Sequence, residues 1–413
     1  MKKINLLVLI LVTYVYASSQ THYGTGASSL GTNNQNFGVS TGNAGTDNAN
    51  FGLYNGSSNT TGSYNSFFGV FTGPLNTTGS ANSFFGQGAG YYNTTGNNNV
   101  FIGTVAGQTN TSGTSNTYVG SWSGFTNSTG SSNAFLGYQA GYNNTADNNV
   151  FLGFQAGLTN NTGTHNVFSG YRAGYLNTTG IQNLFSGNEA GYSNTTGSQN
   201  IFSGNQAGYL NTTGSQNYFS GYQAGYSNTT SNYNNFLGYQ AGYSNTTGSG
   251  NDFWGYQTGY SNTTGSSNHF SGQAAGYSNT TGSYNTYIGG SAGANATGSY
   301  NTFLGSASGQ FATGSRNSYF GYYSGQAANS GTDNTYFGYQ SGMSSQSGAS
   351  GNTFMGSAAG QTNTTGTSNV YLGVSAGLSS NGSNCSFLGA NSGYSMEFQE
   401  KSGRKMYSPM PHV

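Results

Sequence analysis

Side chains that could act as acids, bases, nucleophiles or metal ligands are scarce in this sequence. The 413 residues include seven Lys or Arg, seven Asp or Glu, four His and one Cys. An enzyme needs such groups placed together, and none of the charged residues between positions 18 and 394 pairs with another at motif spacing. We therefore expect no enzymatic activity, no cofactor and no metal site. The charged residues in this range are Asp47, Asp147, Arg172, Glu189, Asp252, Arg316 and Asp333.

The histidines, the cysteine and the glycines also lack a catalytic pattern. His22, His165, His269 and His412 are scattered, and we expect His269 to be a solvent-exposed side chain rather than a ligand. Cys385 is the only cysteine, so an intramolecular disulfide is excluded and a small apolar filler is expected. No Gly-Lys-Ser/Thr follows the glycines as in a phosphate loop, and no Asp recurs as in calcium-binding repeats.

Composition excludes several other classes of protein. The formal net charge is zero, whereas a nucleic-acid binder needs a clustered cationic face. Glycine accounts for 71 residues, proline for three, and aromatic residues for 15%. Disordered chains are typically poor in aromatic residues, so this composition indicates an ordered protein. A conventional globular enzyme would contain far more Lys, Glu, Leu and Ala.

Two recurring side chains could serve binding or modification. The triplet N-T-T matches the N-glycosylation sequon; the interpretation that we favour is a turn, in which Asn and Gly suit the backbone and Thr faces water. It occurs, for instance, at Asn76, Asn177, Asn211, Asn228, Asn245 and Asn262. A tyrosine column offers amphipathic area to glycans or a partner, although core packing or contact between chains is the preferred explanation. Its members include Tyr192, Tyr209, Tyr226, Tyr243, Tyr260 and Tyr277.

A repeat of consensus N-x-F-x-G-Y-Q-A-G-Y-S-N-T-T-G-S-x must position these residues. We number its positions from the aromatic residue, which is position 0. Twenty copies follow one another, and 14 of the 19 intervals are 17 residues long. The aromatic residues, which we expect to form the core, are Phe67, Phe84, Phe101, Tyr118, Phe135, Phe151, Phe168, Phe185, Phe202, Phe219, Phe236, Phe253, Phe270, Tyr287, Phe303, Tyr319, Tyr336, Phe354, Tyr371 and Phe387.

The variation in repeat length separates strand from turn. The glycines at positions +2 and +6 keep their spacing in every copy, whereas length changes fall in N-T-T-G-S. Paired strands resist length changes and turns absorb them. Since Gly, Asn, Ser and Thr are also poor helix formers, the repeat predicts an all-β fold. We expect a parallel β-solenoid or β-roll of about 20 coils of 17 residues, each with two short strands and two turns.

Alternation along a strand predicts which side chains face inward. The aromatic residue should lie inside, while the residues at positions −1 and +1 face outward. Stacked aromatic and Asn columns should then give continuous ring packing and amide-to-amide hydrogen bonds along the axis. Position +1 is often apolar, which indicates a contact with another chain. Serines interrupt this row, so that contact should be less apolar along the middle; they are Ser169, Ser186, Ser203, Ser220 and Ser271.

The ends of the chain depart from the repeat. Residues 1–17 predict a secretory signal peptide, with two lysines, an apolar stretch and small residues before the cleavage point. Residues 18–64 predict a lead-in or cap with coils of 14 residues, because Asn-Phe-Gly recurs at that interval. The repeat solenoid spans 65–394, and 395–413 is a polar tail. No other stretch is long and apolar enough to span a membrane.

The run N-A-F-L-G-Y-Q-A-G at residues 133–141 resembles the head repeats of YadA-like trimeric autotransporter adhesins. The likeness extends over about residues 31–394 and implies a left-handed parallel β-roll with three chains packed side by side. This repeat is longer than the usual head repeat and has Phe or Tyr where the family has small aliphatic residues. The stalk and membrane barrel of the family do not follow, so the resemblance does not imply self-anchoring.

From these observations we expect a secreted, non-enzymatic structural or adhesive rod at the cell surface, extracellular or bacterial. It would self-associate as a homo-oligomer, namely a trimer, or as a filament, and bind glycans, matrix or cells by avidity. It would bind no nucleic acid, and the mature chain would not insert into a membrane. Two alternatives are an ice-binding protein with a Thr-rich edge and the rod segment of a viral or secreted fibre. Adjacent threonines such as Thr77 and Thr78 argue against ice binding, because both cannot face out from a flat strand.

Overall fold

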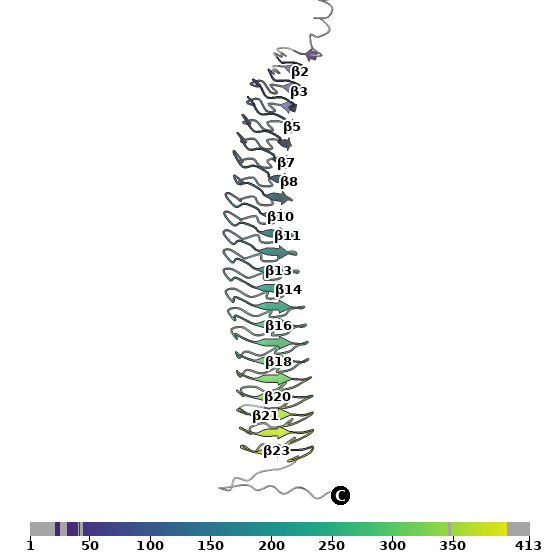
Figure 1. Cartoon of the computed structure of the whole chain (residues 1–413), viewed down its shortest axis with the longest axis vertical. Coiled ribbons are helices and arrows are strands. Elements are labelled where there is room, and N and C mark those ends of the chain that lie inside the picture. Colours follow the sequence, from purple (N-terminus) through teal and green to yellow (C-terminus); the bar gives the residue numbers. More distant parts are fainter. Residues whose placement is uncertain (1–20, 25–30, 40, 42–43, 346–347, 395–413) are drawn as a thin grey trace, which may run out of the picture. The chain divides into compact units, whose positions relative to one another are not determined.

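The computed structural model describes residues 21–24, 31–39, 41, 44–345 and 348–394. Over these residues the chain forms a parallel β-solenoid with no helix, so the predicted fold class is confirmed. The chain divides into two compact units, one up to Gln199 and one from Asn200. Figure 1 shows the strands of each unit lying side by side in chain order.

The first unit contains eleven strands, and those described pair in parallel with their neighbours along the sequence. The strands are β1 (Thr21–Tyr23), β2 (Gln35–Val39), β3 (Ala49–Leu53), β4 (Ser66–Val70), β5 (Ser83–Phe85), β6 (Val100–Ile102), β7 (Thr117–Val119), β8 (Ala134–Leu136), β9 (Val150–Leu152), β10 (Val167–Ser169) and β11 (Leu184–Ser186).

The second unit contains twelve strands with the same parallel pairing. They are β12 (Ile201–Ser203), β13 (Tyr218–Ser220), β14 (Asn235–Leu237), β15 (Asp252–Trp254), β16 (His269–Ser271), β17 (Thr286–Ile288), β18 (Thr302–Leu304), β19 (Ser318–Phe320), β20 (Thr335–Phe337), β21 (Thr353–Met355), β22 (Val370–Leu372) and β23 (Ser386–Leu388).

Each full coil contains one strand, so the expectation of two strands per coil is wrong. From β5 onward the strand has three residues and carries the aromatic residue at its centre. The rest of the coil bends, because positions +4 and +14 adopt left-handed backbone angles, as at Gln223 (φ 52°) and Gln216 (φ 59°). Such angles interrupt extended structure. The backbone of neighbouring coils is still linked there, for example by Thr246 N–H to Thr263 O at 2.9 Å.

The repeat aromatic residues form a buried stack in each unit. Phe236 is fully buried, and its ring lies 4.8 Å from Phe219 and 4.9 Å from Phe253, with planes within 8° of parallel. The ring spacing matches the distance between neighbouring strands, which is about 4.8 Å. All twenty repeat aromatic residues, from Phe67 to Phe387, are at most 3% exposed. The rings therefore form the apolar part of each coil's interior.

Two asparagine ladders form the polar part of that interior. At position −2, the backbone N–H of Asn251 donates to Oδ1 of Asn234 at 2.9 Å, and its Nδ2 donates to the Gly265 carbonyl at 2.8 Å. At position +9, Nδ2 of Asn262 donates to Oδ1 of Asn245 at 2.8 Å. Most of the buried amides in these ladders thus bond to a neighbouring coil, which satisfies groups that would be costly to bury unpaired.

Replacing Asn251 with alanine is expected to lower the free energy of unfolding by about 2–4 kcal/mol, because the variant leaves buried partners without a hydrogen bond. Those partners include the backbone N–H of Asn268, which donates to Oδ1 of Asn251 at 3.0 Å. Urea denaturation followed by circular dichroism measures the loss. Asn205→Ala, at an exposed position, is the control and should change stability by less than about 0.5 kcal/mol. Equal losses in both variants would contradict the role of the ladder.

Tyrosine in the core is accompanied by a smaller residue at position +9. Tyr287 is paired with Ala296, Tyr319 with Ala328, and the hydroxyl of Tyr336 donates to Oγ of Ser345 at 3.1 Å. Coils with a core Phe usually have Asn at position +9, as the sequence shows. The phenol hydroxyl therefore occupies space that the Asn side chain fills elsewhere. Tyr118 is an exception, since its hydroxyl accepts a hydrogen bond from Nδ2 of Asn127.

The buried phenols predict a loss of stability at high pH. Burial raises the pKa of Tyr287, Tyr319 and Tyr336 above the ordinary value of 10.0. A raised pKa in the folded state keeps stability constant below about pH 10. Above that pH the unfolded chain ionises first, and stability falls by about 1.4 kcal/mol per pH unit for each such tyrosine.

We expect the double variant Tyr287→Phe/Tyr319→Phe to show a shallower decline between pH 10 and 11.5, measured by urea denaturation at each pH. Asn205→Ala, which leaves every phenol in place, is the control and should keep the slope of the unchanged protein. Identical slopes for the unchanged protein and the double variant would contradict the prediction.

The lead-in begins with shorter coils and has a different core residue. Strands β1, β2 and β3 pair residues that are 14 apart, such as Asn36 with Asn50. Asn50 is buried and aligns with Phe67, whereas Phe51 aligns with Phe68 in the outward row. The coil that begins at Asn36 has 14 residues, as predicted for the lead-in, whereas the coil that begins at Asn50 has 17 residues and still carries Asn inside, so the prediction of 14-residue coils up to residue 64 is wrong for that coil. Nδ2 of Asn50 donates to Oδ1 of Asn36 at 2.8 Å, which continues the amide stacking.

Candidate functional site

Few side chains that could do chemistry lie close together in the described residues. Within them no three His, Cys, Asp or Glu side chains lie together in an arrangement that could hold a metal ion. An ion pair of Arg316 with Asp333 and a contact of His269 with Asp252 nevertheless join residues one coil apart, so the expectation that no charged residues pair at motif spacing is wrong. The repeat explains both pairs, because residues 17 apart in sequence are neighbours in space.

The first pair lies on the outward face of the strands. Nδ1 of His269 is 2.9 Å from Oδ2 of Asp252, and Nδ2 of Asn235 donates to Oδ1 of the same carboxylate at 2.9 Å. The imidazole also meets the ring of Trp254 edge-on, with centroids 5.7 Å apart. His269 is about one third exposed, so it faces outward as expected. Its carboxylate partner Asp252 was not predicted from the sequence.

The second pair lies on the turn at position +14. Arg316 donates from Nε and Nη2 to the two carboxylate oxygens of Asp333 at 2.6 and 2.9 Å. The guanidinium holds the pKa of Asp333 below its ordinary value. Both side chains are at least half exposed, so we expect the pair to contribute little to stability.

The strand face, formed by the side chains at positions −1 and +1 of every coil, carries many of the exposed large apolar side chains. Trp254 at position +1 is 46% exposed and Phe337 is 54% exposed. In four of the five coils with serine at position +1, position −1 carries the apolar side chain instead, and in the fifth it carries His269. We expected a less apolar middle of the row, and this expectation is wrong because the neighbouring column continues it. The compensating residues are Val167, Leu184, Ile201 and Tyr218, each about 40% exposed.

The tyrosine column at position +7 is half-buried and stacked. Tyr209 and Tyr226 have ring centroids 5.1 Å apart with planes 3° from parallel, and Tyr226, Tyr243, Tyr260 and Tyr277 continue the series. Tyr192 stacks on Tyr175 in the first unit. Ring faces turned toward one another leave edges and hydroxyls on the surface. A sugar ring stacks on an aromatic face, so this geometry weakens the prediction of a stacking strip for glycans.

A second aromatic column at position +3 is more exposed, and the sequence reading did not single it out. Tyr222, Tyr239 and Tyr256 stack at 5.1 and 5.2 Å and are 43–50% exposed. The consensus G-Y-Q-A-G-Y contains both tyrosines, so the same periodicity could have identified it. Between the two columns lies position +4, where a glutamine ladder forms; Nε2 of Gln240 donates to Oε1 of Gln223 at 2.9 Å.

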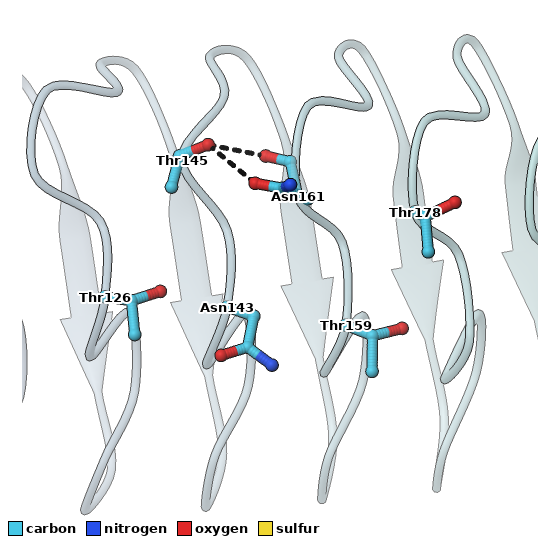
Figure 2. Close-up of a pocket in the computed structure, with 6 residues that line it drawn as sticks. All are labelled: Thr126, Asn143, Thr145, Thr159, Asn161 and Thr178. Carbon is cyan, nitrogen blue, oxygen red and sulfur yellow. Dashed lines mark hydrogen bonds between the residues drawn. The ribbon is translucent and has the colours of Figure 1, made fainter.

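A shallow polar groove in the first unit lies between the side chains at position +8 and those at position +10 of successive coils, as Figure 2 shows. Thr145 donates its hydroxyl hydrogen toward the backbone and side-chain oxygens of Asn161 at 2.9 and 3.1 Å. Thr126 and Thr159 likewise donate to carbonyls of the following coil. These hydroxyl hydrogens are therefore used within the solenoid. Asn143 and Thr178 complete the lining.

The threonine edge differs from the expectation based on strand alternation. Thr77 and Thr78 both face outward, since the chain bends there instead of running as a flat strand. The premise of that argument against ice binding is therefore wrong. The hydroxyl of Thr77 nevertheless donates to the Thr94 carbonyl at 3.0 Å, and the same bond recurs at Thr246. An edge whose hydroxyl hydrogens bond internally offers fewer donors to an ice surface.

The asparagines of the N-T-T triplets are interior residues. Asn76, Asn177, Asn211, Asn228, Asn245 and Asn262 are fully buried. Nδ2 of Asn245 donates to the Gly248 carbonyl at 2.9 Å and to Oδ1 of Asn228 at 3.0 Å. A glycan attached to this nitrogen would have to replace those bonds inside the coil. The folded solenoid therefore has no room for glycosylation at these positions, and the triplet is structural.

Cys385 is a buried free thiol at position −2 of the last described coil. Every other full coil has Asn at this position, so the thiol replaces an amide and not an apolar side chain. Its backbone N–H still donates to Oδ1 of Asn369 at 2.9 Å. The backbone bond of the ladder is thus kept without the side-chain amide.

Some of the sequence predictions lie outside the described residues. These are the signal peptide at 1–17 and the polar tail at 395–413. In the described part of the chain there is no helix of the length and hydropathy needed to cross a membrane.

Comparison with known proteins adds no relative. No family model matches the chain, and no curated protein matches it.

Proposed function

We propose that this chain is a secreted, non-enzymatic structural or adhesive protein of the cell surface that self-associates through repeated solenoid faces. The observation that carries the proposal is the strand face, where all full coils but one present a large apolar side chain to solvent. Apolar surface of this extent on a monomer usually marks an interaction site. Export rests on the signal peptide predicted for residues 1–17.

Repetition supplies the mechanism. Every coil offers the same small set of outward groups at a spacing of about 4.8 Å, so weak contacts can form in many coils at once. Stacked tyrosine edges, hydroxyls and glutamine amides at positions +3, +4 and +7 are the groups that would contact glycans, matrix or another cell surface. Only 14 charged residues occur in the chain, so such contacts would depend little on salt.

Light scattering and binding assays test this proposal. We expect the purified mature chain to have a native mass of at least two copies, and to bind cells, matrix or glycan arrays through its tyrosine columns. A triple variant, Tyr222→Ser/Tyr239→Ser/Tyr256→Ser, should lose that binding and keep its native mass. A monomer that binds no cells, glycans or matrix would overturn the proposal.

Ice binding is the alternative that a simple measurement separates. The internal bonds of the threonine hydroxyls lead us to expect no thermal hysteresis from the purified chain. Thermal hysteresis that disappears on replacing Thr246 and Thr263 with valine would favour the alternative.

A further inference from the structure

The two outward side chains of each strand differ in size in a regular way. In β12 and β13 the large residue is at position −1, as in Tyr218 with Ser220. In β14 the large residue moves to position +1, as in Asn235 with Leu237. β16 returns to the first arrangement, with His269 and Ser271. From β17 to β21 the large residue is again at position +1 and its partner is always Thr or Ser; the large residues are Ile288, Leu304, Phe320, Phe337 and Met355.

The first unit shows the same exchange by itself. In β4, β5 and β8 the large side chain is at position +1, and in β10 and β11 it is at position −1. Val167 with Ser169 and Leu184 with Ser186 are the exchanged coils. In most coils of each unit one large and one small residue share the strand face, and the side on which the large one lies changes at particular coils.

We infer that the strand face packs against the same face of a second copy, with the two-fold axis parallel to the solenoid axis, so that position −1 of each coil faces position +1 of the same coil in the partner. This inference rests on the self-association proposed above and specifies its partner, symmetry and register. Such a two-fold axis keeps the order of the coils and reverses the strand direction. Tyr218 then fills the space above Ser220 of the partner subunit, and the symmetry repeats the contact.

The other face-to-face two-fold axis, along the strands, fits these sizes poorly. It would reverse the order of the coils and place position +1 against position +1. With the twelve coils of the second unit fully overlapped, Phe337 would then meet Trp254 of the partner subunit and Met355 would meet Leu237 of the partner subunit, while Thr286 faced Thr302 of the partner subunit across a gap. Overpacked and underpacked contacts are both unfavourable, so the axis parallel to the solenoid is preferred.

The coils where the large side chain changes sides fix the register. A shift by one coil would bring Tyr218 against Leu237 of the partner subunit and His269 against either Trp254 or Ile288. Those contacts place large side chains on large ones, whereas the unshifted register pairs large with small throughout this region. A uniform repeat could slide along its copy, and these exchanges prevent it.

Charge and area also suit a second copy. On the strand face of the second unit the Asp, Glu, Lys, Arg and His residues are Asp252 and His269, and these two side chains already contact each other within the chain at 2.9 Å. In the proposed register Asp252 faces the indole of Trp254, a hydrogen-bond donor, across the interface. A large side chain that is about 40–50% exposed offers about 80 Å². Eight of the twelve coils of this unit carry a large apolar side chain that is 39–78% exposed, so these side chains alone offer about 600 Å² per partner; the half-buried side chains of the other coils add to this, toward the roughly 800 Å² of a stable interface.

Disulfide trapping between two differently labelled chains tests the register. In a Cys385→Ser background, a chain carrying His269→Cys is mixed with a chain carrying Ser271→Cys under mild oxidation. The inference predicts a crosslinked heterodimer on mixing, and at most about one tenth as much crosslinking when either variant is oxidised alone. A chain carrying Ile288→Cys replaces Ser271→Cys as the control shifted by one coil, and should crosslink to the His269→Cys chain at least tenfold less.

Exchange of side-chain size provides a second test. Ser220→Tyr should weaken the dimer at least tenfold, because Tyr218 would face a tyrosine of the partner. The double variant Tyr218→Ser/Ser220→Tyr should recover most of the affinity, because the large residue has only changed sides. Tyr218 is exposed and Ser220 is half-buried in the single chain, and both side chains point away from the core, so the circular dichroism spectrum should not change.

The outcomes separate this inference from the proposed function. A wild-type chain that is monomeric overturns the self-association itself. An assembled chain that crosslinks equally through position 288, or shows no rescue in the double variant, overturns the register and symmetry alone. A native mass of three copies with in-register crosslinks overturns the two-fold axis and favours a three-fold arrangement.

Discussion

Gly238→Ala is expected to destabilise the second unit by more than about 3 kcal/mol and to abolish folding of the surrounding coils at 37 °C. Gly238 lies at position +2 with φ of 142°, and an added Cβ would lie 2.2 Å from the carbonyl oxygen of Gly255 in the next coil. That oxygen belongs to backbone, so the neighbour cannot move without opening the space between coils. The loss would be measured by thermal and urea denaturation followed by circular dichroism.

Gly250→Ala is the matched control. Gly250 also has a positive φ, of 67°, but the nearest atom to an added Cβ is the Ser267 hydroxyl at 3.7 Å. Tyr233 and Ser267 occupy the same position of neighbouring coils with similar backbone angles, so a side chain is tolerated there. We expect a change of at most about 1–2 kcal/mol in this variant. If Gly238→Ala were no more destabilising than Gly250→Ala, the claim that the coils stack too closely to admit a Cβ at position +2 would be wrong.

Phe236→Ala is expected to lower the free energy of unfolding by about 3–5 kcal/mol. The ring is fully buried and stacks on Phe219 and Phe253, so its removal leaves a cavity and ends two ring contacts. Urea denaturation monitored by the far-ultraviolet signal and by tyrosine fluorescence gives the change. Leu237→Ala, on the outward side of the same strand, should cost less than about 1 kcal/mol in the single chain and weaken self-association instead.

Substitutions at position +9 provide a second test of packing in the core. Phe236→Tyr should be destabilising, because Asn245 occupies the space that a hydroxyl would need. The double variant Phe236→Tyr/Asn245→Ser should recover much of the loss, since Tyr336 with Ser345 already shows this combination in the chain. If the two single changes were simply additive in the double variant, the proposed exchange of volume between positions 0 and +9 would be wrong.

The fold could be predicted because the repeat length and the invariant positions reflect the stacking itself. A residue that returns every 17 positions must have the same environment in every coil, and Phe236 with its neighbours illustrates this. The glycines at positions +2 and +6 were recognisable as invariant. Their reasons are the φ angles and the contacts that only three-dimensional stacking creates.

Other features could not be predicted because they depend on backbone angles. The left-handed backbone angles at Gln216 and Gln223 prevent a second strand in the coil. Glutamine rarely adopts such angles, so the sequence did not indicate them. The lead-in shows a similar limit. Asn36-Phe37-Gly38 resembles the full repeat, but Asn36 lies in the core and the phenylalanine lies in the outward row.

The surface was only partly predictable. Alternation along the strand predicted the outward apolar row at position +1. It did not predict that Leu184, Ile201 and Tyr218 continue this apolar surface, because they lie at position −1 and the two positions form a single face. The ion pair of Arg316 with Asp333 could have been found from the repeat length alone, because the two residues are 17 apart. The stacking of surface tyrosines could be expected from their period, whereas the orientation of their faces required the structure.

Native mass measured by light scattering tests the central claim most directly. For the mature chain at micromolar concentration we predict twice the mass of one chain, and for the strand-face variant Ile288→Ser/Phe337→Ser/Met355→Ser the mass of one chain with an unchanged circular dichroism spectrum. These three side chains are 39–54% exposed in the single chain, so their loss should act on association and not on folding. A wild-type chain that remains monomeric at concentrations of tens of micromolar, or a variant that associates as strongly as wild type, would contradict the claim that this face joins copies of the chain.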